Sequence, residues 1–396
     1  MTSGNERPLE TLRIVEWSHG AGAAYAGRLL ATLGATVILA EPPDGSPLRA
    51  APPFLPNTEV SALFSYLAIG KQSVVCDLDA DQGRADLHSL IENADAFVTD
   101  VAIDERAALG LAEEQLAAVN AKLVYVSVLP FGAYGPKCKW QAEEINVIHA
   151  AGEGFLLPNG LSVDLFPDRP PLKIYGHFAE MQGGIVAALG ALVALWCRDD
   201  IGGQAVDVSS QDAMLAVGAF AVQRYGDGSL EHRRTRSFRY GGVLECLDGY
   251  VEVLPLEEHQ WKGLIELLDR PEWAFAPGLK DPIERGKHGA MINHHLRAWA
   301  AGRKTNDIVQ RAQALNVPMA RYNTPADVLA DPHEISRGLF QPVEIPDVGI
   351  LDAVVSPFHF DGAPLRLEEG PPRLGQHQAI LGGRQSGTGA MKVGVA

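Results

Sequence analysis

Short apolar runs alternate with longer amphipathic stretches over the first third of the chain. The runs predict strands at 12–17, 36–41, 73–79, 95–100 and 123–129. The stretches between them place apolar residues at helical spacing, and they predict helices at 21–33, at 82–92 and near Glu113. Because strand and helix alternate, the pattern favours a parallel, doubly wound sheet of the α/β class.

A longer apolar segment at 178–198 predicts a helix in the middle of the chain, which Gly202 and Gly203 would end. A strand at 204–210 and a helix from Gln211 follow. The most apolar part of the segment, 183–196, is shorter than the roughly 20 residues that a helix needs to cross a bilayer. The first ten residues lack the pattern of a signal peptide. We therefore expect a cytoplasmic protein.

The character of the chain changes after a polar, turn-rich stretch at 224–239, which resembles a linker. Two short strands joined by Asp248 and Gly249 predict a hairpin, and helices are expected at 258–268, 292–300, 305–313 and 325–330. Short strands return at 341–360. The expected organisation is therefore a large domain at 1–223, a linker at 224–240, a small α+β domain at 241–335, and a return to the large domain at 336–396.

The composition narrows the range of partners. The chain of 396 residues has 33 Lys and Arg against 49 Asp and Glu, a formal net charge of −16. Nucleic acids and anionic membrane surfaces are unfavourable partners for such a chain. Four cysteines lie far apart without a CxxC pair, so we expect structural thiols in a reducing compartment and neither a metal site nor a disulfide framework.

The turn after the first predicted strand contains Gly20 and Gly22 and could belong to a dinucleotide-binding fingerprint. The third glycine of the GxGxxG spacing is replaced by Tyr25. This spacing argues against classical dinucleotide binding.

Longer strings of residues are more specific. GGQAVDVSSQDAMLAV at 202–217 resembles the GxGQxVDVSxxDA block of the class III CoA-transferase family, the CaiB/BaiF type to which formyl-CoA transferase belongs. The strings at 8–49 and 70–79 resemble the opening strand, helix and lysine segment of that family. NVPMARYNTPADVLADPHEISRGLF and PRLGQHQAIL resemble its later motifs. The resemblance covers almost the whole chain in the same order.

Membership of this family implies a Rossmann-like large domain, a smaller α+β domain, and two subunits threaded through each other as an interlocked dimer. It implies transfer of CoA from an acyl-CoA thioester to a small organic carboxylate, with CoA thioesters as substrates and no permanently bound cofactor. In such enzymes a carboxylate side chain attacks the thioester and gives a mixed anhydride and CoA thiolate.

The family's nucleophile is an Asp just before the long apolar helix, in a pattern like A-D-x-x-x-G. FAEMQGGIVAALG at 178–190 places Glu180 at that position. The chain therefore supplies a carboxylate that is longer than Asp by one methylene, a difference that shifts the reactive oxygen by about an ångström. The alternative is that Glu180 only starts a helix, where an acid interacts well with the helix dipole.

Candidate contacts to CoA phosphates are cationic, because phosphates form charge-assisted hydrogen bonds. Arg49 and Lys71 fall at positions that family members use around the nucleotide, and Lys137 and Lys139 follow the strand at 123–129. The segment at 100–104 departs from the family's N-F-R-P-G, because carboxylates stand where the family has an amide and a cation. This departure indicates a CoA site that is weakened, altered or lost.

Two further interpretations stay open. The chain could be a non-catalytic subunit of a hetero-oligomeric class III CoA-transferase whose active Asp lies on the partner. A third candidate is an acyl-CoA racemase or isomerase, for which a His and a carboxylate would exchange a proton next to the thioester. His149 and His177 are the histidines nearest to the corresponding region, but neither falls on the racemase motif. A homodimer and a heteromer with a related subunit are both compatible with these interpretations.

Overall fold

The computed structural model describes residues 7–156, 168, 170, 172–218, 240–367 and 369–382. The chain divides into two compact units. Unit 1 comprises Met1–Ala151, Tyr175–Val217 and His333–Ala396, and unit 2 comprises Gly152–Ile174 and Gly218–Pro332. The linker predicted at 224–239 lies outside the described residues.

Unit 1 is built on a six-stranded sheet in the order β3-β2-β1-β4-β5-β6. All neighbouring strands are parallel, which confirms the predicted α/β, Rossmann-like class. The strands are β1 Arg13–Trp17, β2 Thr36–Glu41, β3 Lys71–Val75, β4 Ala96–Thr99, β5 Val124–Leu129 and β6 Ala205–Ser209. The predicted strand at 73–79 was placed too late, because the buried start of β3 includes a lysine that a hydrophobic pattern does not count.

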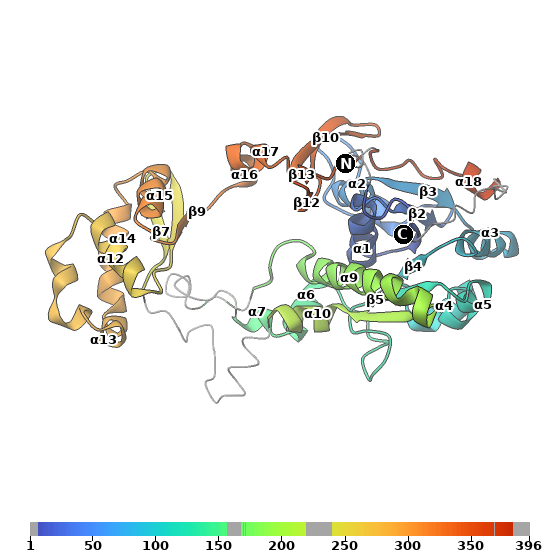
Figure 1. The fold of residues 1–396 in the computed structure, drawn as a ribbon, viewed down its shortest axis with the longest axis horizontal. Coiled ribbons are helices and arrows are strands. Elements are labelled where there is room, and N and C mark those ends of the chain that lie inside the picture. The colour runs from blue at the N-terminus through green and yellow to red at the C-terminus, as the bar shows by residue number, and fades with distance from the viewer. Residues whose placement is uncertain are drawn as a thin grey trace, which may run out of the picture. The chain divides into compact units, whose positions relative to one another are not determined.

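Helices cover both faces of this sheet (Figure 1). α1 (Ala21–Thr32) and α9 (Phe178–Ile201) pack on one face, and α3 (Asp81–Ile91), α4 (Ile103–Leu109) and α5 (Glu113–Val119) lie over the other. Shorter elements complete this part of the unit: η1 Pro47–Ala50, α2 Ala62–Ala68, α6 Glu144–Ala150 and α10 Ser210–Val217. α2 and α4, which have 7 residues each, were not predicted.

The helices α1 and α9 approach each other through glycines. A Cβ atom at Gly184 would lie 2.5 Å from the carbonyl oxygen of Gly22, and one at Gly22 would lie 3.0 Å from the carbonyl oxygen of Glu180. Alanines continue the contact along α9, where Ala187 and Ala191 are fully buried. Two backbones in such close contact tolerate only the smallest side chains.

A buried ion pair links two strands of the sheet. Lys71 on β3 lies 2.7 Å from Glu16 on β1, and their side chains are 1% and 0% exposed. The ammonium group also donates to the Ala24 carbonyl oxygen at 2.8 Å, and Ser18 donates to the carboxylate at 2.7 Å. A Cβ atom at Gly27 would come within 1.7 Å of a Glu16 oxygen, so this glycine leaves the space that the pair occupies.

The last part of unit 1 packs against the free edge of β3. After α17 (Pro332–Ser336) come the hairpin of β10 (Phe340–Ile345) and β11 (Gly349–Val354) and the short pair β12 (His359–Phe360) and β13 (Ala363–Pro364). His377 and Gln378 then bond to the outward backbone groups of Ser73 and Val75, before α18 (Ala379–Gly382). α18 packs over α3 through Ile380 and Leu381.

Unit 2 is an α+β body with its own core. The predicted hairpin is present as β7 (Gly242–Cys246) and β8 (Gly249–Val253), and β9 (Met319–Arg321) adds a third antiparallel strand. The helices are α12 Glu258–Leu267, α13 Pro282–Lys287, α14 Gly289–Ala300, α15 Thr305–Ala314 and α16 Pro325–Leu329, with turns η2 Glu272–Phe275 and η3 Pro277–Leu279. Trp261, Leu264 and Leu296 lie in the buried centre of this unit.

α9 is longer than its most apolar part suggested. It has 24 residues and is long and apolar enough, by length and composition only, to cross a membrane. Core helices of soluble proteins meet the same criterion, and α9 packs against α1, β5 and α10. α9 is therefore packed on one side against the core of unit 1, and its other side is exposed in this chain.

The contact of α1 with α9 gives a first prediction. Gly184→Val should lower the free energy of unfolding by about 3 kcal/mol, because the new side chain would overlap backbone atoms of α1. Asp200→Asn, at an exposed position in the last turn of the same helix, is the matched control and should change it by less than about 1 kcal/mol. Urea unfolding measures both, and equal stability of the two variants would contradict the contact.

The ion pair gives a second prediction. Lys71→Met should cost about 3–5 kcal/mol at neutral pH, because it leaves the Glu16 carboxylate buried without its partner. The double variant Lys71→Met/Glu16→Leu should recover at least about 2 kcal/mol of this loss. Burial already raises the pKa of Glu16 against the opposing effect of Lys71, and loss of the lysine raises it further.

The difference between the two variants should therefore shrink as the pH falls through the raised pKa of Glu16 and its side chain becomes neutral. Urea unfolding of both variants at pH 7 and pH 5 measures this difference. A single variant as stable as the double variant at pH 7 would contradict a buried, charged Glu16.

Candidate active site

A cleft of about 440 Å³ opens at the carboxyl ends of β1, β4 and β5. Between β1 and β4 the strand order reverses, and ligands of doubly wound sheets bind at this type of switch point. The polar side chains that line the cleft are His19, Asp100, Glu143, His177, Glu180 and Ser210. The other lining residues are glycine, alanine, proline, leucine and valine. The cleft therefore combines an apolar wall with several carboxylates.

Glu180 lies in the first turn of α9 with its side chain 25% exposed. Its Oε2 atom is 2.6 Å from Nδ1 of His177, the residue just before the helix. The close approach of Gly22 to the Glu180 backbone holds this turn against the first turn of α1. The carboxylate predicted as a nucleophile thus lies in the cleft, and one of its oxygens is hydrogen-bonded to the imidazole of His177.

The start of α9 is capped by a residue from another helix. One carboxylate oxygen of Glu144 accepts a hydrogen bond from the Ala179 amide at 2.8 Å, and the other accepts one from the Glu180 amide at 3.1 Å. Glu144 lies in the first turn of α6 and is buried. Sequence reasoning missed this role, because a cap that comes from 35 residues away leaves no local pattern.

Asp100 follows β4 and occupies the start of α1. Its carboxylate accepts hydrogen bonds from the amides of His19 at 2.8 Å and Gly20 at 2.6 Å. Burial raises the pKa of Asp100, the two amide bonds oppose this effect, and the charge of Glu180 adds to it. The amides at the start of α1 are thus already bonded to an anion of the chain itself.

Arg49 does not line this cleft, although its neighbour Leu48 does. It forms a bidentate ion pair with Glu41, at 2.6 Å and 2.7 Å, and donates to the Pro372 carbonyl oxygen. Its guanidinium group lies 4.1 Å from the ring centroid of Phe64. Arg49, which we predicted to contact the nucleotide, is thus already bound by other side chains and a backbone carbonyl of unit 1.

Lys71 also does not line the cleft. Its ammonium group donates to both oxygens of Glu16 and to the Ala24 carbonyl, which accounts for its three donors. The structure gives this lysine a role inside the sheet.

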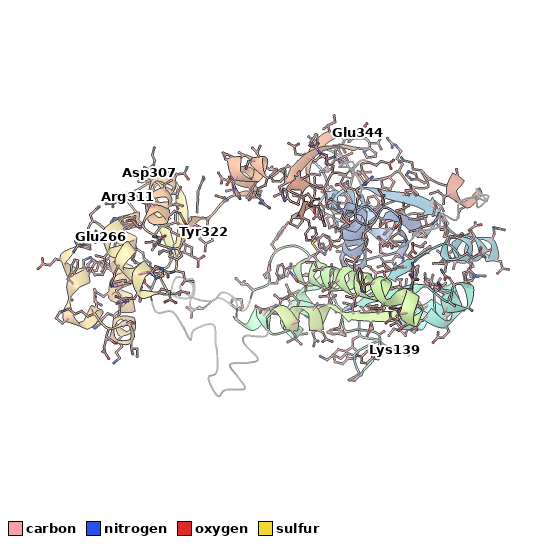
Figure 2. The ribbon with its side chains drawn as sticks, viewed as in Figure 1. Lys139, Glu266, Asp307, Arg311, Tyr322 and Glu344 are labelled. Atoms are coloured by element: carbon pink, nitrogen blue, oxygen red, sulfur yellow. The ribbon has the colours of Figure 1, made fainter. Side chains whose placement is uncertain are left out.

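Lys137 and Lys139 lie on the loop after β5, where Figure 2 labels Lys139. Lys137 is half-buried, and its ammonium group is 3.4 Å from a side-chain oxygen of Gln211 on α10. Lys139 is exposed. Since Ser210 at the start of α10 lines the cleft, this loop lies next to the site.

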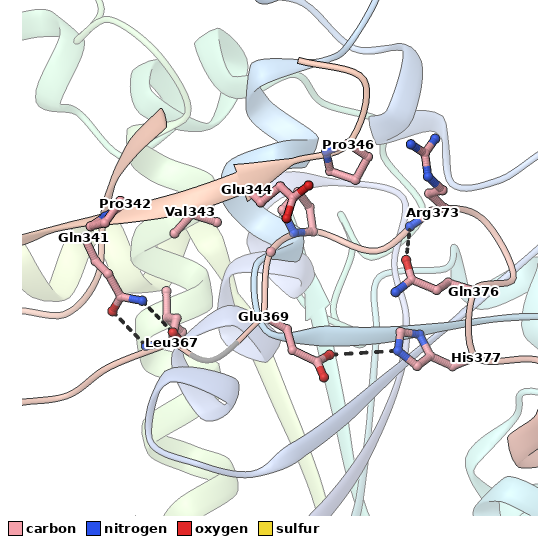
Figure 3. Close-up of a pocket in the computed structure, with 12 residues that line it drawn as sticks. Gln341, Pro342, Val343, Glu344, Pro346, Leu367, Glu369, Arg373, Gln376 and His377 are labelled. Carbon is pink, nitrogen blue, oxygen red and sulfur yellow. Dashed lines mark hydrogen bonds and ion pairs between the residues drawn. The ribbon is translucent and has the colours of Figure 1, made fainter. Parts of the chain in front are cut away.

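A second cavity, of about 480 Å³, lies between β10 and the segment that leads to α18 (Figure 3). Its lining includes His377 and Glu369, whose side chains face each other at 3.9 Å. Nδ1 of His377 accepts a hydrogen bond from the Ser73 amide at 3.1 Å. The cavity shares no lining residue with the cleft at Glu180, and the histidine of the C-terminal motif serves the edge of the sheet.

The thiols and the metal-binding residue types show no assembled site in the part of the chain that the structure describes. All four cysteines are free, and Cys76 and Cys246 are buried. No group of three His, Cys, Asp or Glu side chains among the described residues could hold a metal ion.

Comparison with known proteins agrees with the motifs. Relatives include a formyl-CoA:oxalate CoA-transferase of Streptomyces avermitilis, 28% identical over 94% of this chain and 94% of that protein. A succinyl-CoA–D-citramalate CoA-transferase of Chloroflexus aurantiacus is also 28% identical, over 94% of this chain and 92% of that protein.

A solved CAIB/BAIF family protein from Brucella suis has the same fold. Its TM-score is 0.83 at 26% identity, and the comparison covers 96% of this chain and 99% of that one. The sequence model of the protein family described as CoA-transferase family III matches residues 9–378 of this chain. Fold, motifs and this match over nearly the whole length agree, and the chain belongs to CoA-transferase family III.

Proposed function

We propose that this protein transfers CoA between an acyl-CoA thioester and a small organic carboxylate, with Glu180 as the nucleophile. One observation carries the proposal: the residue at the position of the family's Asp is a carboxylate that lies in the cleft at the switch point of the sheet. The names of relatives that act on formyl-CoA and succinyl-CoA support the same reaction class.

The chemistry follows from the carboxylate. An oxygen of Glu180 attacks the thioester carbonyl carbon, the C–S bond breaks, and CoA leaves as a thiolate with the electron pair. The product on the enzyme is a mixed anhydride, which preserves the energy of the thioester for transfer to the second acid. The cleft is the place where an acyl group would meet the carboxylate, and its apolar wall would keep water from the anhydride.

CoA phosphates would bind outside the apolar part of the cleft. Of the four predicted cations, Lys137 and Lys139 lie on the loop after β5, and the Lys137 ammonium group reaches Gln211 on α10. Arg49 and Lys71 are engaged with carboxylates of the chain itself. We therefore assign the phosphate contacts to the loop after β5.

A second candidate is a subunit of a hetero-oligomeric CoA-transferase whose active Asp belongs to the partner. One relative favours it: a protein of Thauera aromatica named as subunit BbsE of succinyl-CoA:(R)-benzylsuccinate CoA-transferase, 26% identical over 92% of this chain. Proton exchange of the racemase type is less well supported. His177 and Glu180 are in direct contact, so they approach a substrate from the same side, whereas inversion needs groups on opposite sides.

An exposed apolar stripe on α9 supports an oligomer. Leu189, Val193 and Trp196 are 61%, 58% and 88% exposed, and their spacing places them along one side of the helix. Such a stripe is typical of a surface that another chain covers. We propose a dimer with the interlocked arrangement that the family resemblance implies, in the cytoplasm, where acyl-CoA thioesters would be available to it.

The nucleophile gives the third prediction. Glu180→Gln should lower kcat at least about a thousandfold, since an amide cannot form the anhydride. Glu180→Asp should keep a measurable rate, reduced about a hundredfold by the retreat of the carboxylate. Glu113→Gln, an exposed acid in the first turn of α5, is the control and should retain full activity.

Trapping identifies the reacting atom. Wild-type protein incubated with acyl-CoA and then with hydroxylamine should carry a hydroxamate at Glu180, detected by mass spectrometry of peptides. A wild-type chain that gives neither adduct nor transfer would exclude the proposed reaction for the chain alone. Activity that returns only with a related subunit bearing the usual Asp would establish the second candidate in its place.

Assembly gives the fourth prediction. Sedimentation velocity should show a dimer that persists on dilution. Two subunits that are threaded through each other can separate only after one of them partly unfolds. A folded, monodisperse monomer at any concentration would contradict the interlocked arrangement.

A further inference from the structure

The hydrogen bond from His177 to Glu180 suggests a second catalytic group, and this inference rests on the proposed function. Nδ1 of His177 is 2.6 Å from Oε2 of Glu180. An ionised carboxylate can only accept hydrogen bonds, so Nδ1 is the donor. Oε2 is therefore fixed by the imidazole, and Oε1 is the oxygen left to attack a thioester.

The backbone fixes the position of the imidazole. His177 immediately precedes α9, and its carbonyl oxygen accepts a hydrogen bond from the Met181 amide at 2.9 Å. The side chains at 177 and 180 are one helical turn apart, which places neighbouring groups on the same side. The contact therefore follows from the start of α9 and is present before any substrate binds.

The other charged groups around His177 and Glu180 are carboxylates, and His177 differs from them in carrying N–H groups that can donate hydrogen bonds. Asp100 from the end of β4, together with Glu143 and Glu144 from α6, brings negative charge to the same cleft wall or to the start of α9. The amides of Ala179 and Glu180 are bonded to Glu144. These two backbone donors are thus engaged by Glu144, whereas Nδ1 of His177 is directed at the Glu180 carboxyl group.

We propose that His177 stabilises the oxyanion that forms on Oε2 during the second chemical step. After the first step, Oε1 bridges the donor acyl group and the Glu180 side chain in the anhydride. The CoA thiolate attacks Cδ of Glu180 and forms a C–S bond, and the electron pair of the carbonyl moves onto Oε2. The carbonyl then re-forms as the bond from Cδ to Oε1 breaks, and the donor acid leaves with Oε1 as a carboxylate.

The Nδ1–H group lies within hydrogen-bond distance of the atom on which this charge develops, which is the geometric requirement for an oxyanion donor. His177 is thereby assigned to formation of the glutamyl-CoA thioester. Attack on the acyl-CoA, in which the charge develops on the substrate oxygen, would depend on it much less.

Three variants of His177 test this assignment. His177→Ala should lower kcat about a hundredfold, the usual effect of removing one oxyanion donor, while KM for acyl-CoA stays within about threefold. His177→Asn carries an N–H donor near the position of Nδ1 and should recover at least about tenfold of the loss. His177→Gln carries its donor near the position of Nε2 and should behave like the alanine variant.

His149→Ala is the matched control, because His149 is exposed on α6 and does not line the cleft. Mass spectrometry of samples quenched during a single turnover should show glutamyl-CoA at Glu180 in wild type and about a hundredfold slower formation of it in the alanine variant. The melting temperatures of all variants show whether each is folded, and the Asn variant keeps the test available if the alanine variant is not.

The outcomes distinguish the role of His177 from the role of Glu180. Wild-type kcat in the alanine variant, or equal losses in the Asn and Gln variants, would overturn the role of His177 and leave Glu180 as the nucleophile. A loss confined to KM would overturn it as well. Wild-type protein that forms no adduct at Glu180 would overturn the proposed function and this inference together.

Discussion

The close contact between the backbones of α1 and α9 determines where the Glu180 side chain is placed. Gly22 and Gly184 face each other at a distance that excludes a Cβ atom. This contact sets the start of α9 beside the turn after β1, at the point where the strand order reverses. Glu180 therefore reaches the cleft because two glycines allow one helix to lie on another. The site depends on packing several residues away from the carboxylate itself.

Charge inside unit 1 is also organised through pairs that link separate elements. Glu16 on β1 binds Lys71 on β3, and Glu41 on β2 binds Arg49 while accepting a hydrogen bond from Ser73. A buried carboxylate without such a partner is costly, so each acid constrains the element that carries its partner. In an acidic chain with a net charge of −16, these internal pairs engage two of the cations that a motif would assign to a ligand.

Much of the fold could be predicted from the sequence, because apolar periodicity reports burial directly. β1, β2, α1, α9 and the hairpin of unit 2 occur close to their predicted positions, whereas the short α2 and the three-residue β9 have no period to detect. The site was less accessible to such reasoning. The position of Glu180 followed from a motif, but its contact with His177 depends on the turn that precedes the helix.

The predicted phosphate contacts show the same limit. A loop cation and a buried cation look alike in a sequence, because the carboxylate that binds Lys71 lies on another strand and the one that binds Arg49 lies at the end of β2. The cap that Glu144 supplies to α9 is equally nonlocal. Sequence patterns thus located most of the elements and the carboxylate at position 180, and tertiary contacts decided which side chains lie beside that carboxylate.

The C-terminal segment has a consequence for solubility. Parallel sheets of this type end in strands whose outer backbone groups are open to pairing with another chain. At β3 these groups are occupied: Gln378 binds both the amide and the carbonyl of Val75 through its side-chain amide, and His377 does the same for Ser73 through its ring and its backbone. The Gln378 side chain thus makes the two backbone hydrogen bonds that a neighbouring strand would make, and it leaves no new row of unpaired backbone groups. Proteolytic loss of the segment that carries His377 and Gln378 would leave these backbone groups of β3 unpaired. Strands of other chains could then pair with β3 and cause aggregation.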